Sequence, residues 1–261
     1  MVRKISLMLC AFLLTVNLFS QEKTEKTHWY TSADAKGYIS IQKIDSLHAN
    51  GISTILKTTV KATFDDEVLN FSLSTINDTH KMVSPLKILF DGTIDSNIKP
   101  VHFTGTQIKK GKKNISYWHF DGDFVDEMET DPDFQRFAYA KYNATLKMPS
   151  RTIPSFNLWA IIPNLPFDRK GTFRFNTLDE TKLYVRKNQT VNYLGKLKAD
   201  INGENMVLHK FVHQGKGMLP VYYWVNNDRE LVQVLLDNQF TFTLNTKKAA
   251  LATKTVAYSN D

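Results

Sequence analysis

The sequence predicts a mainly β protein, built as a single curled antiparallel sheet (a half-barrel, a barrel or a two-layer meander) with a short helix near residues 155–162. Most of the chain alternates apolar and polar residues with period two, in segments rich in Val, Ile, Thr, Tyr and Phe. Between these segments lie pairs such as Asn50-Gly51 and Asn202-Gly203, which tolerate the positive φ angles of tight hairpin turns. A sheet of so many strands accumulates twist, so we expect it to curl.

Eleven segments have the composition and alternation of strands. In chain order they are GYISIQKI (37–44), STILKTTVKATF (53–64), VLNFSLSTI (68–76), VHFTGTQI (101–108), NISYWHF (114–120), GTFRFNTL (171–178), TKLYVRK (181–187), MVLHKFVH (206–213), VYYWV (221–225), LVQVLL (231–236) and QFTFTL (239–244). Most neighbouring segments are separated by short turns, which predicts a sequential antiparallel meander.

The expected helix lies in the stretch PSFNLWAIIPNLPF, Pro154 to Phe167. Its prolines make it too short and too kinked to span a bilayer as a helix. Two helical turns fit before Pro163, with Ser155 as the N-terminal cap. Phe156, Trp159 and Ile162 would then lie along one face. These three residues are our candidate ligand-binding residues, and the same pattern also fits a helix that only completes the core.

Residues 1–20 have the pattern of a secretory signal peptide, with Arg3 and Lys4 ahead of an uncharged run that ends at Ser20. Cys10 lies inside this run and follows Leu9, so the small residue expected before a lipid-modified cysteine is missing. Cleavage would leave no cysteine and no transmembrane segment. We therefore expect an exported protein of a Gram-negative bacterium, located in the periplasm, at the periphery of the outer membrane or outside the cell.

Residues 21–261 are expected to form one β-rich domain, in which the acidic and polar segment 122–134 separates two lobes of the same sheet. Loss of the signal peptide lowers the formal charge from +7 to +5, and the basic residues are spread along the chain. The densest basic cluster, KKGKK at 109–113, has the composition of a hairpin tip. We therefore expect no nucleic-acid partner.

No motif in the sequence indicates a cofactor, a metal or a catalytic residue. The chain has no phosphate-binding glycine loop, no dinucleotide fingerprint, no Gly-x-Ser-x-Gly elbow and no His-Glu-x-x-His pair. His209 and His213 lie on an expected strand, where four residues span about 13 Å and two imidazoles cannot share an ion. The acidic run 121–133 lacks the glycine at the sixth position and the final glutamate of an EF-hand loop.

The second half of the chain resembles a known family. In order, it contains IPSFNLWAIIPNLPF, a GTFRF strand, the segment KLYVRKNQTVNYLGKLKADI as a hairpin, and LPVYYWVNNDRELVQVLL. This order is similar to a family of exported β-rich bacterial proteins of unknown function, which in turn resembles the half-barrel of periplasmic lipoprotein carriers. The resemblance covers residues 153–244. It implies an apolar concave face and supplies no catalytic residue.

Three functions are compatible with these observations. The first is a non-catalytic envelope protein that holds a lipid or other apolar ligand in its curled sheet. The second is a polysaccharide-active enzyme or carbohydrate-binding module that uses exposed aromatic residues with nearby His and Arg. The aromatic candidates for such a face are Tyr117, Trp118, Tyr222, Tyr223 and Trp224. The third is a structural assembly partner at the outer membrane.

The signal sequence makes a prediction about processing. The exported protein should begin near Gln21 and carry no lipid, because Cys10 lies within the segment that is removed. Intact mass spectrometry of the exported protein checks both points. A mass that includes residues 1–20, or a diacylglyceryl adduct on Cys10, would contradict the prediction.

Overall fold

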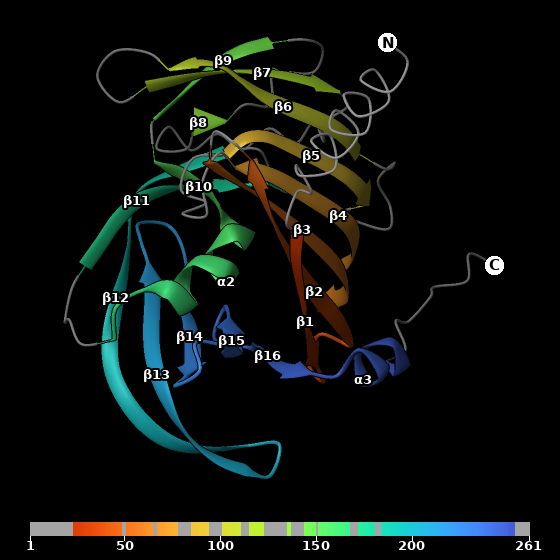
Figure 1. Ribbon diagram of the computed structural model, residues 1–261, viewed down its shortest axis with the longest axis vertical. Helices are drawn as coiled ribbons and strands as arrows, with labels where there is room; N and C mark the ends of the chain where they lie inside the picture. Colours follow the sequence, from red (N-terminus) through yellow and green to blue (C-terminus); the bar gives the residue numbers. More distant parts are fainter. Residues whose placement is uncertain are drawn as a thin grey trace, which may run out of the picture.

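The structure, a computed structural model, confirms the predicted fold class. The protein is mainly β and consists of one curled sheet with short helical segments (Figure 1). The described residues are 23–48, 51–64, 67–77, 85–93, 101–110, 115–122, 135–136, 144–149, 151–167, 172–180 and 184–253. The expected signal peptide, the loop 111–114 and residues 123–134 of the expected lobe boundary lie outside the described residues.

The described residues form a 16-stranded sheet. The strands of the N-terminal part are β1 (Lys23–Ser32), β2 (Gly37–His48), β3 (Gly51–Phe64), β4 (Glu67–Asn77), β5 (Pro85–Thr93), β6 (Val101–Lys110), β7 (Ile115–Gly122), β8 (Gln135–Arg136) and β9 (Ala144–Pro149). Those of the C-terminal part are β10 (Thr152–Pro154), β11 (Thr172–Asp179), β12 (Tyr184–Ile201), β13 (Glu204–Gln214), β14 (Val221–Asn226), β15 (Leu231–Leu236) and β16 (Phe240–Asn245).

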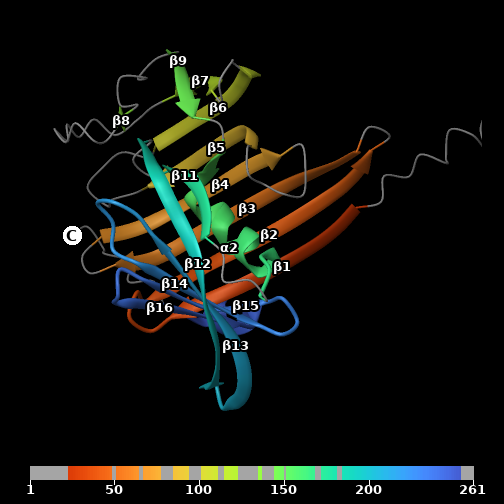
Figure 2. The ribbon, with the colours of Figure 1, turned by 90° about the vertical axis from the view of Figure 1, so that its left-hand side faces the viewer.

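The strand order explains why the sheet is nearly closed. Strands β10 to β16 lie side by side in sequence order, β16 pairs with β1, and the order then runs from β1 through β7 to β9. Strands β9 and β10 therefore stand at the two ends of the order, yet only two residues separate them in the chain. This short link draws the two ends of the sheet toward each other and gives the barrel-like shape (Figures 1 and 2).

The pairing of β1 with β16 joins the two halves of the chain into one sheet. Tyr30 lies opposite Leu244, and Thr31 lies opposite Thr243. After β16 comes the short helix α3 (Lys247–Ala252), which begins where the Thr246 hydroxyl accepts a hydrogen bond from the Ala249 amide. This is the normal chemistry of a helix N-cap.

All eleven predicted strands are present, and the differences lie elsewhere. Strands β1, β5, β8, β9 and β10 were not predicted, and β10 pairs with β11 in parallel rather than antiparallel. The expected hairpin within 182–201 is wrong, because the structure has a single strand, β12, over most of this segment. A bulge between Tyr193 and Gly195 (φ +116°) accommodates the glycine without reversing the chain. The reversal comes instead at Asn202-Gly203, where both residues have positive φ.

The predicted helix is present as three short consecutive pieces, η1 (Ser155–Asn157), α2 (Leu158–Ile161) and η2 (Ile162–Asn164). We call residues 155–164 the plug, because they lie within the curve of the sheet (Figures 1 and 2). The expectation that Ser155 caps the helix is wrong. Pro154 occupies the N-cap position, and the Ser155 hydroxyl lies 3.0 Å from the Leu178 carbonyl oxygen of β11.

The aromatic side chains of the plug pack against strands β1, β4 and β16 of the sheet. Trp159 is only 4% exposed and meets Tyr30 of β1 edge to face, with ring centroids 5.0 Å apart. It also contacts Phe242 of β16 at 6.1 Å. Phe156 meets Phe71 of β4 at 5.8 Å. The plug therefore completes the core that the concave face of the sheet requires.

Polar contacts fix the plug at further points. Asn157 is fully buried, and its side-chain oxygen accepts a hydrogen bond of 3.0 Å from the Thr75 hydroxyl of β4. At the other end of the plug, Arg229 in the turn between β14 and β15 donates to the carbonyl oxygens of Pro163 and Leu165. Pro163 lies in the last helical turn and Leu165 directly after it, where the carbonyl oxygens at a helix end lack intrahelical donors.

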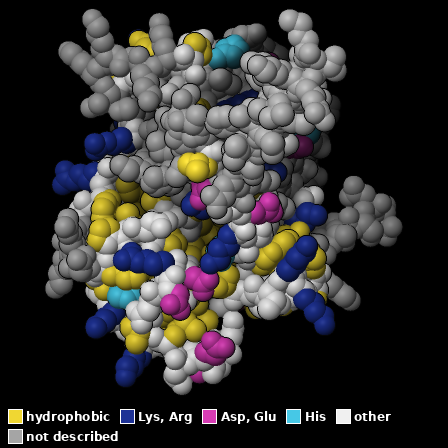
Figure 3. All heavy atoms as spheres, in the orientation of Figure 1, with side chains coloured by type: hydrophobic (Ala, Val, Ile, Leu, Met, Phe, Trp, Pro, Cys, Tyr) yellow, Lys and Arg dark blue, Asp and Glu magenta, His cyan; other side chains and the backbone are white. Residues whose placement is uncertain are grey.

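The described surface is mixed in character. Figure 3 shows basic, acidic and hydrophobic side chains distributed over the described part of one face. Among the described residues, no helix has both the length and the hydropathy needed to cross a membrane.

The packing of the plug predicts a large loss of stability when its central side chain is removed. Trp159→Ala should lower the free energy of unfolding by about 3 to 5 kcal/mol, because it leaves a cavity among buried rings. Trp224→Ala is the matched control, since Trp224 is only partly buried and does not contact the plug through its ring. Its loss should be less than half as large. Chemical denaturation of both variants checks this, and equal losses would show that the plug is not central to the core.

Candidate functional site

The main candidate site is a cavity of about 420 Å³ beside the first half of the plug, which we call the plug cavity. Its polar lining residues come mainly from the ends of β11, β12 and β13, and its apolar ones come from the plug, the loop before β14, and β14 and β15. They include Phe156, Trp159, Thr177, Asp179, Glu180, Arg186, His213, Met218, Leu219, Val221, Tyr223 and Leu236. The cavity is therefore amphiphilic.

Glu180 lies directly after β11 and holds the start of the plug. It is 1% exposed, and its carboxyl oxygens lie 3.1 Å from the Phe156 amide nitrogen and 2.5 Å from the Ser155 hydroxyl. Burial raises the pKa of Glu180 to about 7, although the hydrogen bonds from Ser155 and Phe156 favour the charged form. When the carboxyl is protonated it can donate to the Ser155 oxygen, while Ser155 donates to the Leu178 carbonyl.

His213 supplies a buried polar atom that lacks a hydrogen bond. It is 4% exposed and packs against Phe175, with ring centroids 5.4 Å apart. Burial, and secondarily the charge of Arg186, lowers the pKa of His213 to about 4, so the ring is neutral at pH 7. Its Nε2 atom has no hydrogen-bond partner in the part of the chain that the structure describes. Buried polar atoms rarely lack a hydrogen-bond partner, which makes this atom a candidate ligand contact.

Arg186 contributes the positive charge of the plug cavity, but its guanidinium is already engaged. It lies over the Tyr184 ring at 4.6 Å and donates to the Gly217 carbonyl oxygen at 2.9 Å. Its other terminal nitrogen lies 3.5 Å from the Asp179 carboxylate. Asp179 therefore balances the charge of Arg186 inside the cavity.

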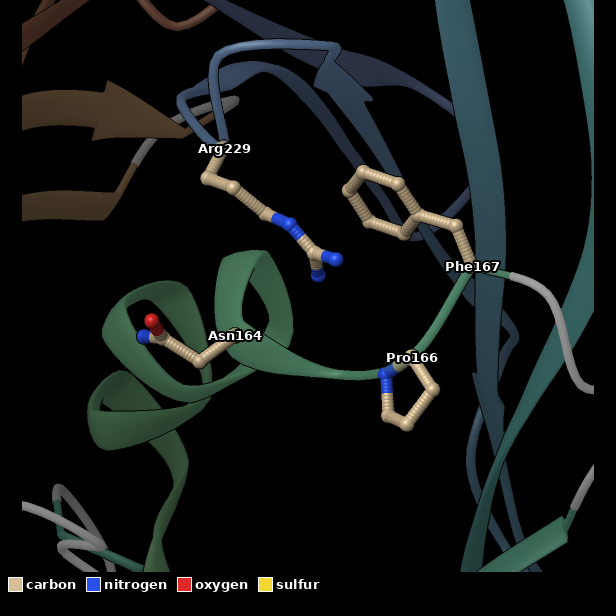
Figure 4. Close-up of a pocket in the computed structure, with 4 residues that line it drawn as sticks. All are labelled: Asn164, Pro166, Phe167 and Arg229. Carbon is tan, nitrogen blue, oxygen red and sulfur yellow. The ribbon is translucent and has the colours of Figure 1, made fainter.

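The three predicted ligand-binding residues do not share one cavity. Phe156 and Trp159 line the plug cavity, whereas Ile162 lines a second cavity of about 470 Å³ between the plug and strands β11 and β12. A third hollow, of about 380 Å³, lies beyond the plug between Asn164, Pro166, Phe167 and Arg229 (Figure 4). There the Arg229 guanidinium stacks on the Phe167 ring at 3.8 Å, which fixes the end of the plug.

Sequence reasoning missed Glu180 and His213 as site residues. Glu180 lies in the segment DETK, which has the composition of an exposed polar turn, and His213 lies at the end of an alternating strand. The placement of His209 and His213 on one strand is confirmed. His209 faces the Phe167 ring at 3.8 Å and does not line the plug cavity.

The aromatic residues considered for a sugar-binding face are divided between the core and the surface. Trp118 and Tyr223 are buried, whereas Tyr222 and Trp224 are partly exposed, with ring centroids 6.1 Å apart. The Lys210 ammonium lies over both rings, 4.4 Å from the Tyr222 centroid and 5.2 Å from that of Trp224. This lysine occupies the ring faces that a sugar would stack on.

The chemistry available in the plug cavity is hydrogen bonding to a small ligand. Among the described residues, no group of three or more His, Cys, Asp or Glu side chains is placed to hold a metal ion. Both carboxyl oxygens of Glu180 contact the plug, and His213 is neutral near pH 7.

No protein-family model, curated protein or solved structure matches the chain.

The opposite pKa shifts of Glu180 and His213 predict opposite pH dependences of stability. Because the folded pKa of Glu180 is raised, its contribution is fully present below about pH 4.5 and is lost as the pH rises through about 7. Because the folded pKa of His213 is lowered, its contribution is present above about pH 6.5 and is lost as the pH falls through about 4. Between pH 4.5 and 6.5 the two effects oppose each other.

Single variants should expose each effect. As the pH falls from 8 to 4, the wild type should become more stable relative to Glu180→Gln. The difference in their unfolding free energies should grow by roughly 3 kcal/mol at most. Relative to His213→Phe, the wild type should instead become more stable as the pH rises from 4 to 8. Urea unfolding at each pH measures both differences, in which the other titrating groups cancel. Differences independent of pH would refute the assigned pKa shifts.

Proposed function

We propose that the protein is an exported, non-catalytic binding protein of the cell envelope, which holds a lipid-like or other apolar ligand in the plug cavity. The observation that carries the proposal is the cavity itself. It lies beside Trp159, has a volume of about 420 Å³ and is lined in large part by apolar side chains. Binding sites for small molecules commonly occupy roughly 300 to 1,000 Å³ and have apolar walls with a few polar groups.

The wall of the cavity suits an aliphatic chain. Met218, Val221 and Leu236 come from the loop before β14 and from β14 and β15, and they face a space that Phe156 and Trp159 also line. Each methylene group that moves from water into such a space gains about 0.8 kcal/mol. The flexible side chain of Met218 can adapt to chains of different shape.

The contacts of Glu180 support binding rather than catalysis. A general acid or base must be able to reach the substrate, yet both carboxyl oxygens of Glu180 hold the first residues of the plug. This carboxyl therefore has a structural role at the edge of the cavity. The signal-peptide pattern of residues 1–20 supports export, and the polysaccharide and assembly functions remain the alternatives that the following experiment separates from this proposal.

Titration with N-phenyl-1-naphthylamine, a neutral apolar fluorophore, tests the proposal. The mature protein should bind it with increased fluorescence and saturate at one site. Met218→Trp should weaken the binding by about tenfold or more, because the larger side chain fills the cavity without removing a core residue. Lipids that co-purify with the natively extracted protein should also be lost from this variant.

Leu251→Trp is the matched control, since Leu251 is exposed on α3 and does not line the plug cavity. It introduces the same side chain and should leave binding unchanged. The proposal fails if the folded wild type binds no fluorophore, or if both variants bind as the wild type does. Binding of soluble oligosaccharides in place of the fluorophore would favour the carbohydrate alternative.

A further inference from the structure

We propose that the plug cavity selects an amphiphile with a neutral, hydrogen-bonding head group, such as an alcohol or a glycerol monoester, over one with an anionic head group. This inference rests on the proposed function, because it concerns the polar end of the same ligand. It is carried by the charges that line the cavity and by the unpaired Nε2 atom of His213.

The charges in the cavity disfavour an anion. Among its lining residues, Arg186 is the only lysine or arginine, and it lies against Asp179 and the Gly217 carbonyl. Glu180 adds a second carboxyl group, which becomes charged as the pH rises through about 7. Asp237, which follows β15, adds a third carboxyl group to the lining. An anionic head group would therefore meet three carboxyl groups and one cation that is already engaged. Coulomb repulsion in so confined a space is weakly screened.

The buried histidine offers what a neutral head group needs. The Nε2 atom of neutral His213 either donates or accepts one hydrogen bond, depending on the tautomer. A hydroxyl group both donates and accepts, so it can pair with either tautomer. Pairing would also remove the cost of leaving a buried polar atom unsatisfied. A carboxylate head group could only accept, and it would lie near Asp179 and Glu180.

The approach to this atom fits a ligand that enters along the apolar wall. His213 lies on β13, and its neighbours in the lining include Val221 and Tyr223 of β14. Leu219, in the loop before β14, is 52% exposed and also lines the cavity. The lining of the cavity thus includes both an exposed residue of this loop and the buried His213.

Displacement of N-phenyl-1-naphthylamine by ligands of equal chain length tests the inference. Dodecanol, 1-lauroylglycerol, dodecanoate and dodecylammonium are compared at pH 8, below their critical aggregation concentrations, with the mature protein. The two neutral ligands should bind about tenfold or more tightly than dodecanoate. Dodecanoate binding as tightly as the neutral ligands would overturn the inference, and so would a preference for dodecylammonium. Failure of all four ligands and of the fluorophore would instead contradict the proposed function.

Variants at His213 assign the preference to this side chain. His213→Phe should weaken binding of 1-lauroylglycerol by about five- to tenfold more than it weakens binding of the fluorophore. His213→Gln, which retains a hydrogen-bonding side chain, should recover part of the loss and serves if the phenylalanine variant does not fold. His209→Phe is the matched control on the same strand outside the cavity and should retain the full preference. If the His213 and His209 variants prefer the neutral ligands over dodecanoate to the same extent, the proposed role of His213 is overturned.

Discussion

The constraint on which the structure depends is the apolar concave face of a curled sheet, which must be covered from within. The link between β9 and β10 draws the ends of the sheet together, and the pairing of β1 with β16 joins its halves. These connections create an interior that strand side chains alone leave incomplete. The plug supplies the missing apolar surface, and its tryptophan contacts both β1 and β16. The closure of the sheet and the position of the plug are therefore parts of one packing solution.

The same constraint explains why the cavity lies where it does. The plug is held at its start by Glu180, in its middle by Thr75 and at its end by Arg229. These polar contacts fix the position of the plug relative to the sheet beside it. The space that remains is amphiphilic, because polar side chains end those strands while apolar ones come from the plug and β14. The proposed ligand completes a core that the protein itself leaves unfilled.

Much of the fold could be predicted from the sequence, because its signals are local. Alternation predicted β11 and β14, and residues that tolerate positive φ predicted the turn at Asn202-Gly203. Pro154 likewise marked the start of the plug, whereas the helical segment continues through Pro163 to Asn164. The pairing of β1 with β16 and the site residues Glu180 and His213 could not be predicted. They depend on which distant segments cover a side chain, and in the sequence Glu180 looks like any residue of an exposed polar turn.

The most direct test of the account is the position of a bound ligand. Nuclear Overhauser effects can be measured between 1-lauroylglycerol and protein in which methionine, tryptophan, histidine and tyrosine are isotopically labelled. The account predicts that the alkyl chain contacts the Met218 methyl group and the Trp159 indole, while the glycerol protons lie near the His213 ring. Contacts confined to the rings of Tyr222 and Trp224 on the surface would contradict it, because they would show that the ligand binds outside the plug cavity.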